Sequence, residues 1–333
     1  MTMTQTMNHG FYGRLKAAFP SQVIIDVTEI CNLACTHCPH PDFKKSEYYS
    51  ARSLTPDLNA KMIDEIAQNE THVQYVRYTS EGEPLVHPKI FEMLSYAKSR
   101  LQAPAIALTT NGKRMPPKYV AQILETQIDL VDISIDAFLP ETYAKIRVGG
   151  DLAVTRANVQ NLLKQRVETK SPLKVVVSYI EQPENVNETA DFQKFWKDQG
   201  ADYVVVRKLH SGAGAIESVK QKMWNETPPD SRRACVYPWE RIVLNPRGFL
   251  SFCPADWTHG STMVDFRSNT VKDVWMGPIY EALRQAHLSN DYSCHKFCGQ
   301  CPDWKTTSWP GVSRGYAEMV EEFRREGPNT VVG

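Results

Sequence analysis

The stretch VIIDVTEICNLACTHC, residues 23–38, joins an apolar, β-branched run to three cysteines with the spacing C-x3-C-x2-C. The three are Cys31, Cys35 and Cys38. They offer soft thiolates of the kind that hold zinc or an iron–sulfur cluster, whereas a closed structural site takes four ligands. A four-iron cluster held by three protein sulfurs keeps one iron free for another molecule. The alternative is a zinc knuckle completed by His37 or His40.

Outward from this stretch, residues 22–210 alternate between short β-branched runs and amphipathic helical segments. The predicted strands cover 23–27, 73–79, 105–110, 128–136, 173–180 and 203–209. The predicted helices are one starting at Thr55–Pro56, then 88–100, 117–125, 141–147, 154–167 and 187–198. This alternation predicts an α/β fold with a parallel sheet and outer helices, because parallel strands need crossover connections. Functional residues are then expected at the carboxyl ends of the strands.

The composition changes after residue 210, where SGAGAIES begins a segment rich in Cys, Trp and Pro. We predict an N-terminal extension (1–20), a βα domain (21–210), a linker (211–233), a Cys-rich domain (234–310) and a C-terminal helix and tail (311–333). Within the last two segments, helices are predicted over 273–287 and 314–326.

Charge and cysteine content indicate a cytoplasmic enzyme. The chain has 38 Lys and Arg against 38 Asp and Glu, so no net field attracts nucleic acid or an anionic membrane. It contains neither a signal peptide nor an apolar run near the ~18 residues of a membrane span. Eight cysteines in such a chain are better explained as metal ligands than as disulfides.

The cysteine spacing, directly after a predicted strand, resembles that of the radical S-adenosylmethionine (SAM) superfamily. The resemblance implies a partial, six-stranded TIM-type barrel, (β/α)6, and a [4Fe–4S] cluster on Cys31, Cys35 and Cys38. The free iron would chelate the amino and carboxylate groups of SAM. One electron from the reduced cluster would cleave SAM to methionine and a 5′-deoxyadenosyl radical, which abstracts a hydrogen atom from the substrate.

Further motifs stand at strand ends. SEGEP (80–84) resembles the family's GGEP motif, with Glu81 replacing the first glycine. In that motif the backbone and the glutamate contact the SAM ammonium, and the glycine lets the backbone approach the ligand closely. LTTNG (108–112) ends the third predicted strand, and SIDA (134–137) ends the fourth. The resemblance implies SAM contacts from His37, Gly82, Glu83, Pro84, Thr110, Asn111, Ser134, Asp136 and Arg147, with the arginine on the SAM carboxylate. The alternative explanations are a turn at GEP, an Asn-Gly turn and a solvated helix-end arginine.

Three polar residues near the ends of the fifth and sixth predicted strands are candidates for substrate contacts. They are Ser178, Arg207 and His210. Their topology points them toward the pocket, although each could equally be an ordinary polar strand terminus.

Five cysteines remain, at positions 235, 253, 294, 298 and 301. The order C-x12-G-x4-C, followed by C-x3-C-x2-C, resembles the auxiliary-cluster domain of the SPASM and twitch subfamily. The resemblance implies one auxiliary [4Fe–4S] cluster on Cys235, Cys253, Cys298 and Cys301, because a full SPASM domain with two clusters needs about seven cysteines. The alternative is a zinc ribbon. Cys294 is then a bystander, a replacement ligand or a hydrogen-atom donor.

The size and the short Cys-rich domain resemble 2-deoxy-scyllo-inosamine dehydrogenase-like and related sugar- and aminocyclitol-modifying enzymes. We therefore expect a small polar substrate (sugar, aminocyclitol or nucleoside type) and its dehydrogenation or epimerisation. Flavodoxin or ferredoxin would supply the electron. The alternatives are a peptide or protein maturase and a zinc-binding interaction protein. Against the maturase, the twenty residues before the first strand are too few to form a leader-binding domain.

Overall fold

The computed structural model describes residues 18–79, 81–226, 232 and 234–305. The predicted helix over 314–326 lies outside these residues. None of the described helices is both long and apolar enough to cross a membrane.

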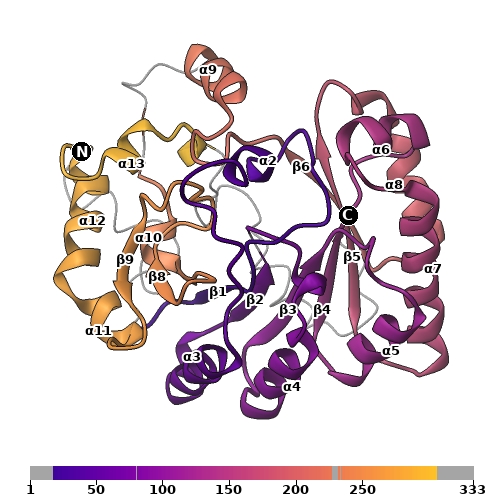
Figure 1. Ribbon diagram of the computed structural model, residues 1–333, viewed down its shortest axis with the longest axis horizontal. Coiled ribbons are helices and arrows are strands. Elements are labelled where there is room, and N and C mark those ends of the chain that lie inside the picture. The colour runs from indigo at the N-terminus through magenta and orange to yellow at the C-terminus, as the bar shows by residue number, and fades with distance from the viewer. Residues whose placement is uncertain (1–17, 80, 227–231, 233, 306–333) are drawn as a thin grey trace.

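Six parallel strands form the centre of the fold (Figure 1). They are β1 (Gln22–Asp26), β2 (Tyr75–Thr79), β3 (Ala105–Thr110), β4 (Leu130–Ser134), β5 (Lys174–Glu181) and β6 (Tyr203–Lys208). Each strand pairs with its neighbours in chain order. That order is the winding of a TIM-type barrel, whereas a doubly wound sheet reverses direction in its middle. The predicted partial (β/α)6 barrel is therefore confirmed.

The crossover helices cover the outer face of the sheet (Figure 1). They are α3 (Pro56–Gln68), α4 (Ile90–Arg100), α5 (Pro117–Glu125), α6 (Pro140–Ile146), α7 (Leu152–Glu168) and α8 (Thr189–Asp198). Sequence signals explain several starts: Thr55 accepts a hydrogen bond from Leu58 N, Asp151 accepts from Ala153 N, and Pro56 and Pro117 occupy first-turn positions. Short 3₁₀ turns, η1 (Glu70–His72), η2 (Pro84–Val86) and η3 (Val186–Glu188), complete the connections.

The two faces of the sheet have different compositions. Outward side chains such as Val76, Ile106 and Val131 join the large core under the helices. On the inner face a small apolar cluster forms the floor, made of Tyr75, Ala105, Ala107, Leu130, Val176 and Tyr203. Polar side chains begin above this floor, toward the carboxyl ends, so the site must lie there.

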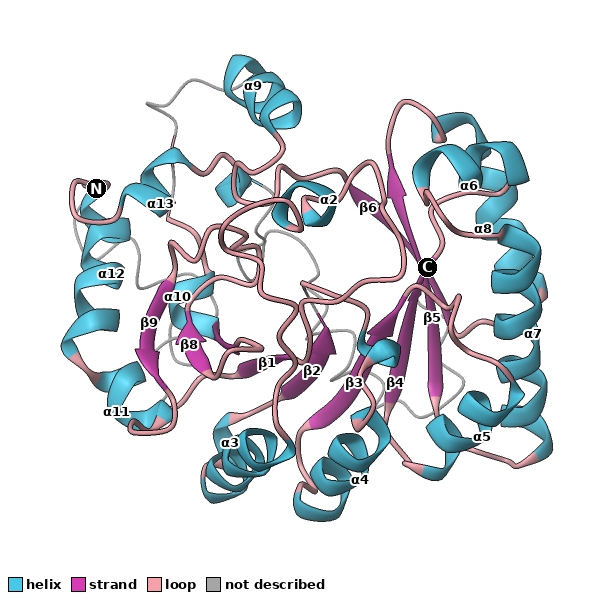
Figure 2. Cartoon of the chain, in the orientation of Figure 1, coloured by secondary structure: helices cyan, strands magenta, loops and turns pink. Residues whose placement is uncertain are grey.

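The Cys-rich segment extends the same sheet. Strand β7 (Arg241–Leu244) pairs in parallel with β1, and β8 (Phe249–Ser251) and β9 (Thr262–Asp265) continue antiparallel to give nine strands. Its helices are α10 (Tyr237–Glu240), α11 (Val271–Met276), α12 (Pro278–Ser289) and α13 (Lys296–Gln300), followed by the turn η5 (Asp303–Lys305). Figure 2 shows this segment beside β1, at the opposite edge of the sheet from β6.

One sequence prediction in this region needs correction, and one needs detail added. The helix predicted over 273–287 is two helices, because Gly277 is extended and Pro278 starts a new helix without an N–H to donate. The predicted linker, 211–233, contains a helix of its own, α9 (Glu217–Glu226). The first residues of this linker are fixed to the C-terminal turn η5, because Asp303 accepts hydrogen bonds from Ser211 N and Ala213 N at 2.8 and 2.6 Å.

Candidate active site

The three clustered cysteines lie on the loop between β1 and the short helix α2 (His40–Phe43). Two backbone hydrogen bonds, Ala34 N to Val148 O (2.9 Å) and Thr36 N to Ile146 O (3.0 Å), fix this loop to the end of α6. All three thiols are free. Burial raises the pKa of Cys31 to about 11 and that of Cys38 to about 12. These thiols therefore need a positive partner, such as a metal, to become thiolates.

A buried cation lies beside this loop. Arg147 Nη1 is 3.6 Å from Cys35 Sγ, and its Nη2 donates to the fully buried Asp136. Burial raises the pKa of Cys35, and the charge of Arg147 opposes that rise. Three free thiols with a guanidinium against one of them fit a thiolate-ligated, negatively charged cluster.

Asp136 holds this arrangement together. One of its oxygens accepts from Ile180 N at 2.7 Å, and the other faces both Arg147 and His37 Nε2, the latter at 3.3 Å. Asp136 has a φ of +61°, an uncommon conformation that Asp tolerates better than most residues. Sequence reasoning proposed all three residues as SAM contacts. The structure brings them together beside Cys35, and their contact with SAM stays a prediction.

Glu83 joins the GEP and TNG motifs. Its Oε1 accepts hydrogen bonds from Leu85 N (3.1 Å) and Thr110 Oγ1 (2.6 Å), and its Oε2 accepts from Asn111 N (2.7 Å). The residue is 3% exposed. Asn111 then reaches the cysteine loop through Nδ2, which donates to Asn32 Oδ1 at 2.7 Å. The carboxylate was predicted to receive the SAM ammonium, and here it organises two strand ends.

Gly82 and Pro84 shape the loop that carries Glu83. A Cβ at Gly82 would lie 2.4 Å from the backbone oxygens of Thr28 and Ile30, so only glycine allows this approach. Glu83 N donates to Ile30 O at 2.9 Å, and Pro84 opens η2. The glycine was predicted to admit a ligand, whereas in the structure it admits the chain segment that leads into the cysteine loop.

The two histidines of the zinc-knuckle alternative have other contacts. His40 Nε2 lies 2.8 Å from Glu29 O, and His37 Nε2 faces Asp136. Among the described residues, no three His, Cys, Asp or Glu side chains converge closely enough for a single metal ion. A four-iron cluster instead spreads its thiolate ligands over separate irons.

A polar network crosses the inner face above the apolar floor. Asp132 is its centre: Oδ2 accepts from Arg207 Nη2 at 2.9 Å and Arg77 Nη2 at 3.3 Å, and Oδ1 accepts from Ser178 Oγ. Arg207 Nη2 also lies 3.2 Å from Ser178 Oγ. The structure thus brings together two of the three predicted substrate residues. The third, His210, lies beyond the end of β6 with its side chain 47% exposed.

Four C-terminal thiols form the second group. Burial raises the pKa of Cys298 to about 12, with Cys235 adding to the rise. Burial also raises the pKa of Cys253 and Cys301, and charges of the other cysteines contribute to both shifts. The guanidinium of Arg232 donates to the backbone oxygens of Cys298 and Gly299. Four thiols that influence one another, one of them buried and three half-buried, fit a four-ligand cluster with no open position.

The remaining predicted residues are placed less centrally. Cys294 is exposed, and its nearest recorded partner is Ser293 Oγ at 4.0 Å. Ser134 is the last residue of β4 and stands opposite Ser178 in the strand register.

Sequence reasoning missed several polar residues of the site, including the buried Asp132 and Asp26 and the half-buried Arg77. A signal was present, because each is a charged residue inside an otherwise apolar strand, where charges are rare unless they are paired. Period-two alternation also places Asp132 and Ser134 on one face of β4. What the pattern could not give is the partner of each charge.

Two family models match the chain. Residues 25–193 match the radical SAM superfamily, and residues 235–302 match SPASM, an iron–sulfur cluster-binding domain.

Curated relatives resemble part of the chain. Mycofactocin maturase MftC of Mycobacterium ulcerans is 27% identical over 230 residues, which are 67% of this chain and 57% of that protein. A tungsten-containing aldehyde ferredoxin oxidoreductase cofactor-modifying protein of Pyrococcus furiosus is 28% identical over 188 residues, 56% of this chain and 50% of its own. The chain therefore spans about half the length of the curated relatives it matches.

Solved structures share the fold. SuiB of Streptococcus suis superposes with a TM-score of 0.62 at 14% identity, over 99% of this chain and 80% of that one. BtrN, in complex with AdoMet and 2-DOIA, gives a TM-score of 0.57 at 14% identity, over 84% and 92%.

Glu83→Gln should destabilise the protein. The Glu83 carboxylate now accepts hydrogen bonds from three donors, and the amide of glutamine would place its own N–H₂ group against one of them. Losing that hydrogen bond at a buried position lowers the free energy of unfolding by about 1 to 3 kcal/mol. We expect the melting temperature of the reconstituted protein to fall by several degrees. The matched control, Glu92→Gln, removes an exposed carboxylate from the pair with Lys89 and should leave the melting temperature within a degree or so. Equal melting temperatures for the two variants would contradict the organising role of Glu83.

Proposed function

The chain belongs to the radical SAM superfamily and carries a SPASM-type domain after the barrel, and we propose that it dehydrogenates a small polar substrate of the sugar, aminocyclitol or nucleoside type. Its cofactors are SAM, the [4Fe–4S] cluster that binds SAM, and an auxiliary iron–sulfur cluster. We assign the first cluster to Cys31, Cys35 and Cys38, and the auxiliary cluster to Cys235, Cys253, Cys298 and Cys301. With SAM bound, the first cluster would supply the one-electron chemistry that cleaves SAM and removes a hydrogen atom from the substrate.

The protein's own residues position these parts. Arg147 places a positive charge against Cys35, and Asp136 fixes that guanidinium. Glu83 holds the ends of β2 and β3 together beside the cysteine loop. Deeper in the barrel, we expect the Asp132 network to offer a polar substrate the guanidinium of Arg207 as a donor and the hydroxyl oxygen of Ser178 as an acceptor, because the Ser178 hydroxyl already donates to Asp132. Oriented donors of this kind reduce the entropy cost of reaching the reactive geometry.

The observation that carries the proposal is the position of Cys253. It lines a pocket together with Asp26 at the carboxyl end of β1 and Glu81 after β2. A cluster on this thiol would supply an electron acceptor next to the barrel's functional end. That placement supports an oxidation, in which the substrate loses one hydrogen atom, one proton and one further electron.

Epimerisation is supported less well. It needs a hydrogen-atom donor on the far face of the substrate, and Cys294 was the candidate. Cys294 is exposed, whereas a donor to a radical is expected in a site shielded from solvent.

Peptide modification is the second candidate function. It is supported by the likeness to a mycofactocin maturase and by the shared fold with SuiB, which was solved bound to precursor peptide SuiA. For either candidate function, dehydrogenation or peptide modification, the external electron donor would be a flavodoxin or ferredoxin.

Metal analysis tests the cluster assignment. Anaerobically reconstituted protein should contain about eight iron and eight sulfide atoms per chain, because each [4Fe–4S] cluster contributes four of each. With SAM and dithionite it should form 5′-deoxyadenosine. About four iron atoms per chain would contradict the auxiliary cluster and the dehydrogenase proposal. Zinc in place of iron, without deoxyadenosine formation, would contradict both cluster assignments.

Cysteine variants separate the two clusters. Cys31→Ala should abolish SAM cleavage, because it removes a ligand of the only cluster with an open iron. Cys253→Ala should retain uncoupled deoxyadenosine formation and lose oxidised product. Deoxyadenosine and product are both measured by mass spectrometry against a panel of amino sugars, cyclitols, nucleosides and peptides. If both variants turn over normally, the two-cluster assignment fails.

Cys294→Ala should leave iron content, deoxyadenosine formation and product yield unchanged, since this exposed thiol lies outside both proposed ligand sets. Loss of product with retained deoxyadenosine, and with deuterium from solvent no longer incorporated, would instead identify a hydrogen-atom donor and favour epimerisation.

A further inference from the structure

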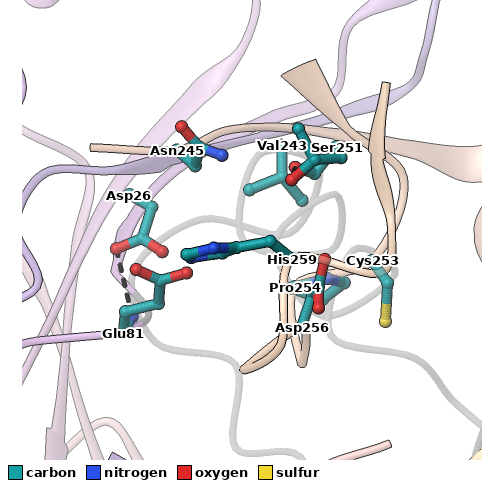
Figure 3. Close-up of a pocket in the computed structure, with 10 residues that line it drawn as sticks. Asp26, Glu81, Val243, Asn245, Ser251, Cys253, Pro254, Asp256 and His259 are labelled. Carbon is teal, nitrogen blue, oxygen red and sulfur yellow. Dashed lines mark hydrogen bonds between the residues drawn. The ribbon is translucent and has the colours of Figure 1, made fainter. Parts of the chain in front are cut away.

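A small acidic pocket lies where the ends of β1 and β2 meet the β7–β8 hairpin (Figure 3). Asp26 and Glu81 line it from the barrel, and Asn245, Cys253 and His259 line it from the SPASM-type domain. Figure 3 shows the imidazole of His259 reaching toward the two carboxyl groups. The free volume is about 10 Å³, which admits a single group of the size of a water molecule or an ammonium.

Two polar atoms of this pocket lack a partner. Glu81 is 7% exposed, and within the described part of the chain its Oε2 makes no hydrogen bond. The same holds for the buried Nε2 of His259. A buried polar atom without a partner costs free energy, so such atoms mark places where a ligand or a water binds. Asp26, the third group, uses Oδ1 to accept from Glu81 N at 3.0 Å.

The charges around the pocket favour a cation over water. Two further carboxylates stand close by, and both are engaged with the backbone: Glu29 with Ser50 N and Arg52 N, and Asp256 with the loop 258–261. Arg247 lies 3.9 Å from Glu29.

The electrostatic consequence falls on Glu81 and Asp26. Burial, followed by the charges of Glu29 and Asp256, raises the pKa of Glu81 to about 8, and Arg247 only partly opposes this. Burial and the charge of Glu81 also raise the pKa of Asp26. A bound cation would relieve both shifts.

We propose that this pocket binds a primary ammonium group of the substrate, held by Glu81, Asp26 and the Nε2 of His259. An ammonium brings three donors and one positive charge, which match two carboxylates and one neutral imidazole nitrogen, whereas a hydroxyl brings one donor and no charge. Burial lowers the pKa of His259, so its ring is neutral and can accept. The inference rests on the proposed function, because it is the neighbouring Cys253 that makes an amine here a substrate group.

The pocket differs from the predicted site of the SAM ammonium. That site is assigned to the loop around Gly82 and Glu83, and Glu83 hydrogen-bonds to η2 and the end of β3. The acidic pocket is instead lined in part by Val243 and Ser251 of the β7–β8 hairpin, and Glu83 is not among its lining residues. A second ammonium can therefore bind while SAM is present.

The test uses the SAM-loaded protein with both clusters and measures its melting temperature. Methylammonium chloride is the probe, and tetramethylammonium chloride at equal concentration is the control, because it has the same charge but no N–H donor and exceeds the pocket. At about tenfold excess over its dissociation constant, methylammonium should raise the melting temperature by about 2 °C relative to the control salt. Equal effects of the two salts on the wild-type protein would overturn the proposal and leave a water-filled pocket.

Variants then locate the effect. Glu81→Gln should abolish the difference between the two salts, and the matched variant Glu125→Gln, which changes an exposed carboxylate at the end of α5, should preserve it. A Glu81→Gln protein that responds like the wild type would overturn the assignment. Because each variant is compared with itself in two salts, a general loss of stability does not imitate the result.

Two larger amines identify the source of the group. Glucosamine represents an amino sugar, and Nα-acetyl-lysine amide represents a lysine of a peptide. The amine with the larger Glu81-dependent shift names the class, and a shift from neither would overturn the proposal. The melting temperature is measured without turnover, so the ammonium site can be tested even if no deoxyadenosine forms. Conversely, the absence of a shift with amines would leave the proposed function untouched.

Discussion

The buried carboxylate of Glu83 is the interaction on which the geometry of the site depends. It accepts hydrogen bonds from the turn after β2 and from the end of β3, while its own backbone N–H donates to the segment that leads into the cysteine loop. Three strand ends that are far apart in sequence are thereby held in one place. The close approach of Gly82 to the backbone oxygens of Thr28 and Ile30 leaves no room for adjustment. The cysteine loop and the ends of β2 and β3 therefore take their relative positions from this contact.

The continuous sheet is the second determinant. Because β7 adds to β1 in parallel, the hairpin that leads to Cys253 is part of the same sheet as the barrel strands. The hairpin β7–β8 then leads directly to Cys253, which brings this thiol to a pocket shared with Asp26. If the two domains were joined only by a flexible linker, the separation between Cys253 and the end of β1 would vary.

Local patterns predicted the six βα units, because β-branched runs and helix caps such as Thr55 and Asp151 act over a few residues. The spacing of Cys31, Cys35 and Cys38 and the order of the five later cysteines predicted the family and its cofactors, because these motifs are also local in sequence. Long-range pairings were not predictable: nothing near residue 241 indicates that β7 pairs with a strand that begins at Gln22. Motif reasoning assigned Glu83, Asp136 and Arg147 to SAM, which stays a prediction, and it did not give the protein groups that each of them contacts in the structure. A sequence motif shows that a residue matters at a site, but the number of its hydrogen bonds depends on neighbours from other elements.

The distribution of charge inside the barrel explains why one pair of carboxylates stands apart. Asp132 is neutralised by Arg77 and Arg207, and Asp136 by Arg147, so both acids sit in paired surroundings despite their burial. Asp26 and Glu81 are equally buried, and the nearby Arg247 pairs with Glu29 instead. A buried carboxyl group is costly to ionise unless a cation lies beside it, and a ligand can supply that cation. Under the two proposals above, the β4–β6 side offers guanidinium groups to an oxygen-bearing part of the substrate, and the β1–β7 side offers carboxyl groups to a cation. A substrate that bears hydroxyl groups at one end and an amine at the other would satisfy both sides at once.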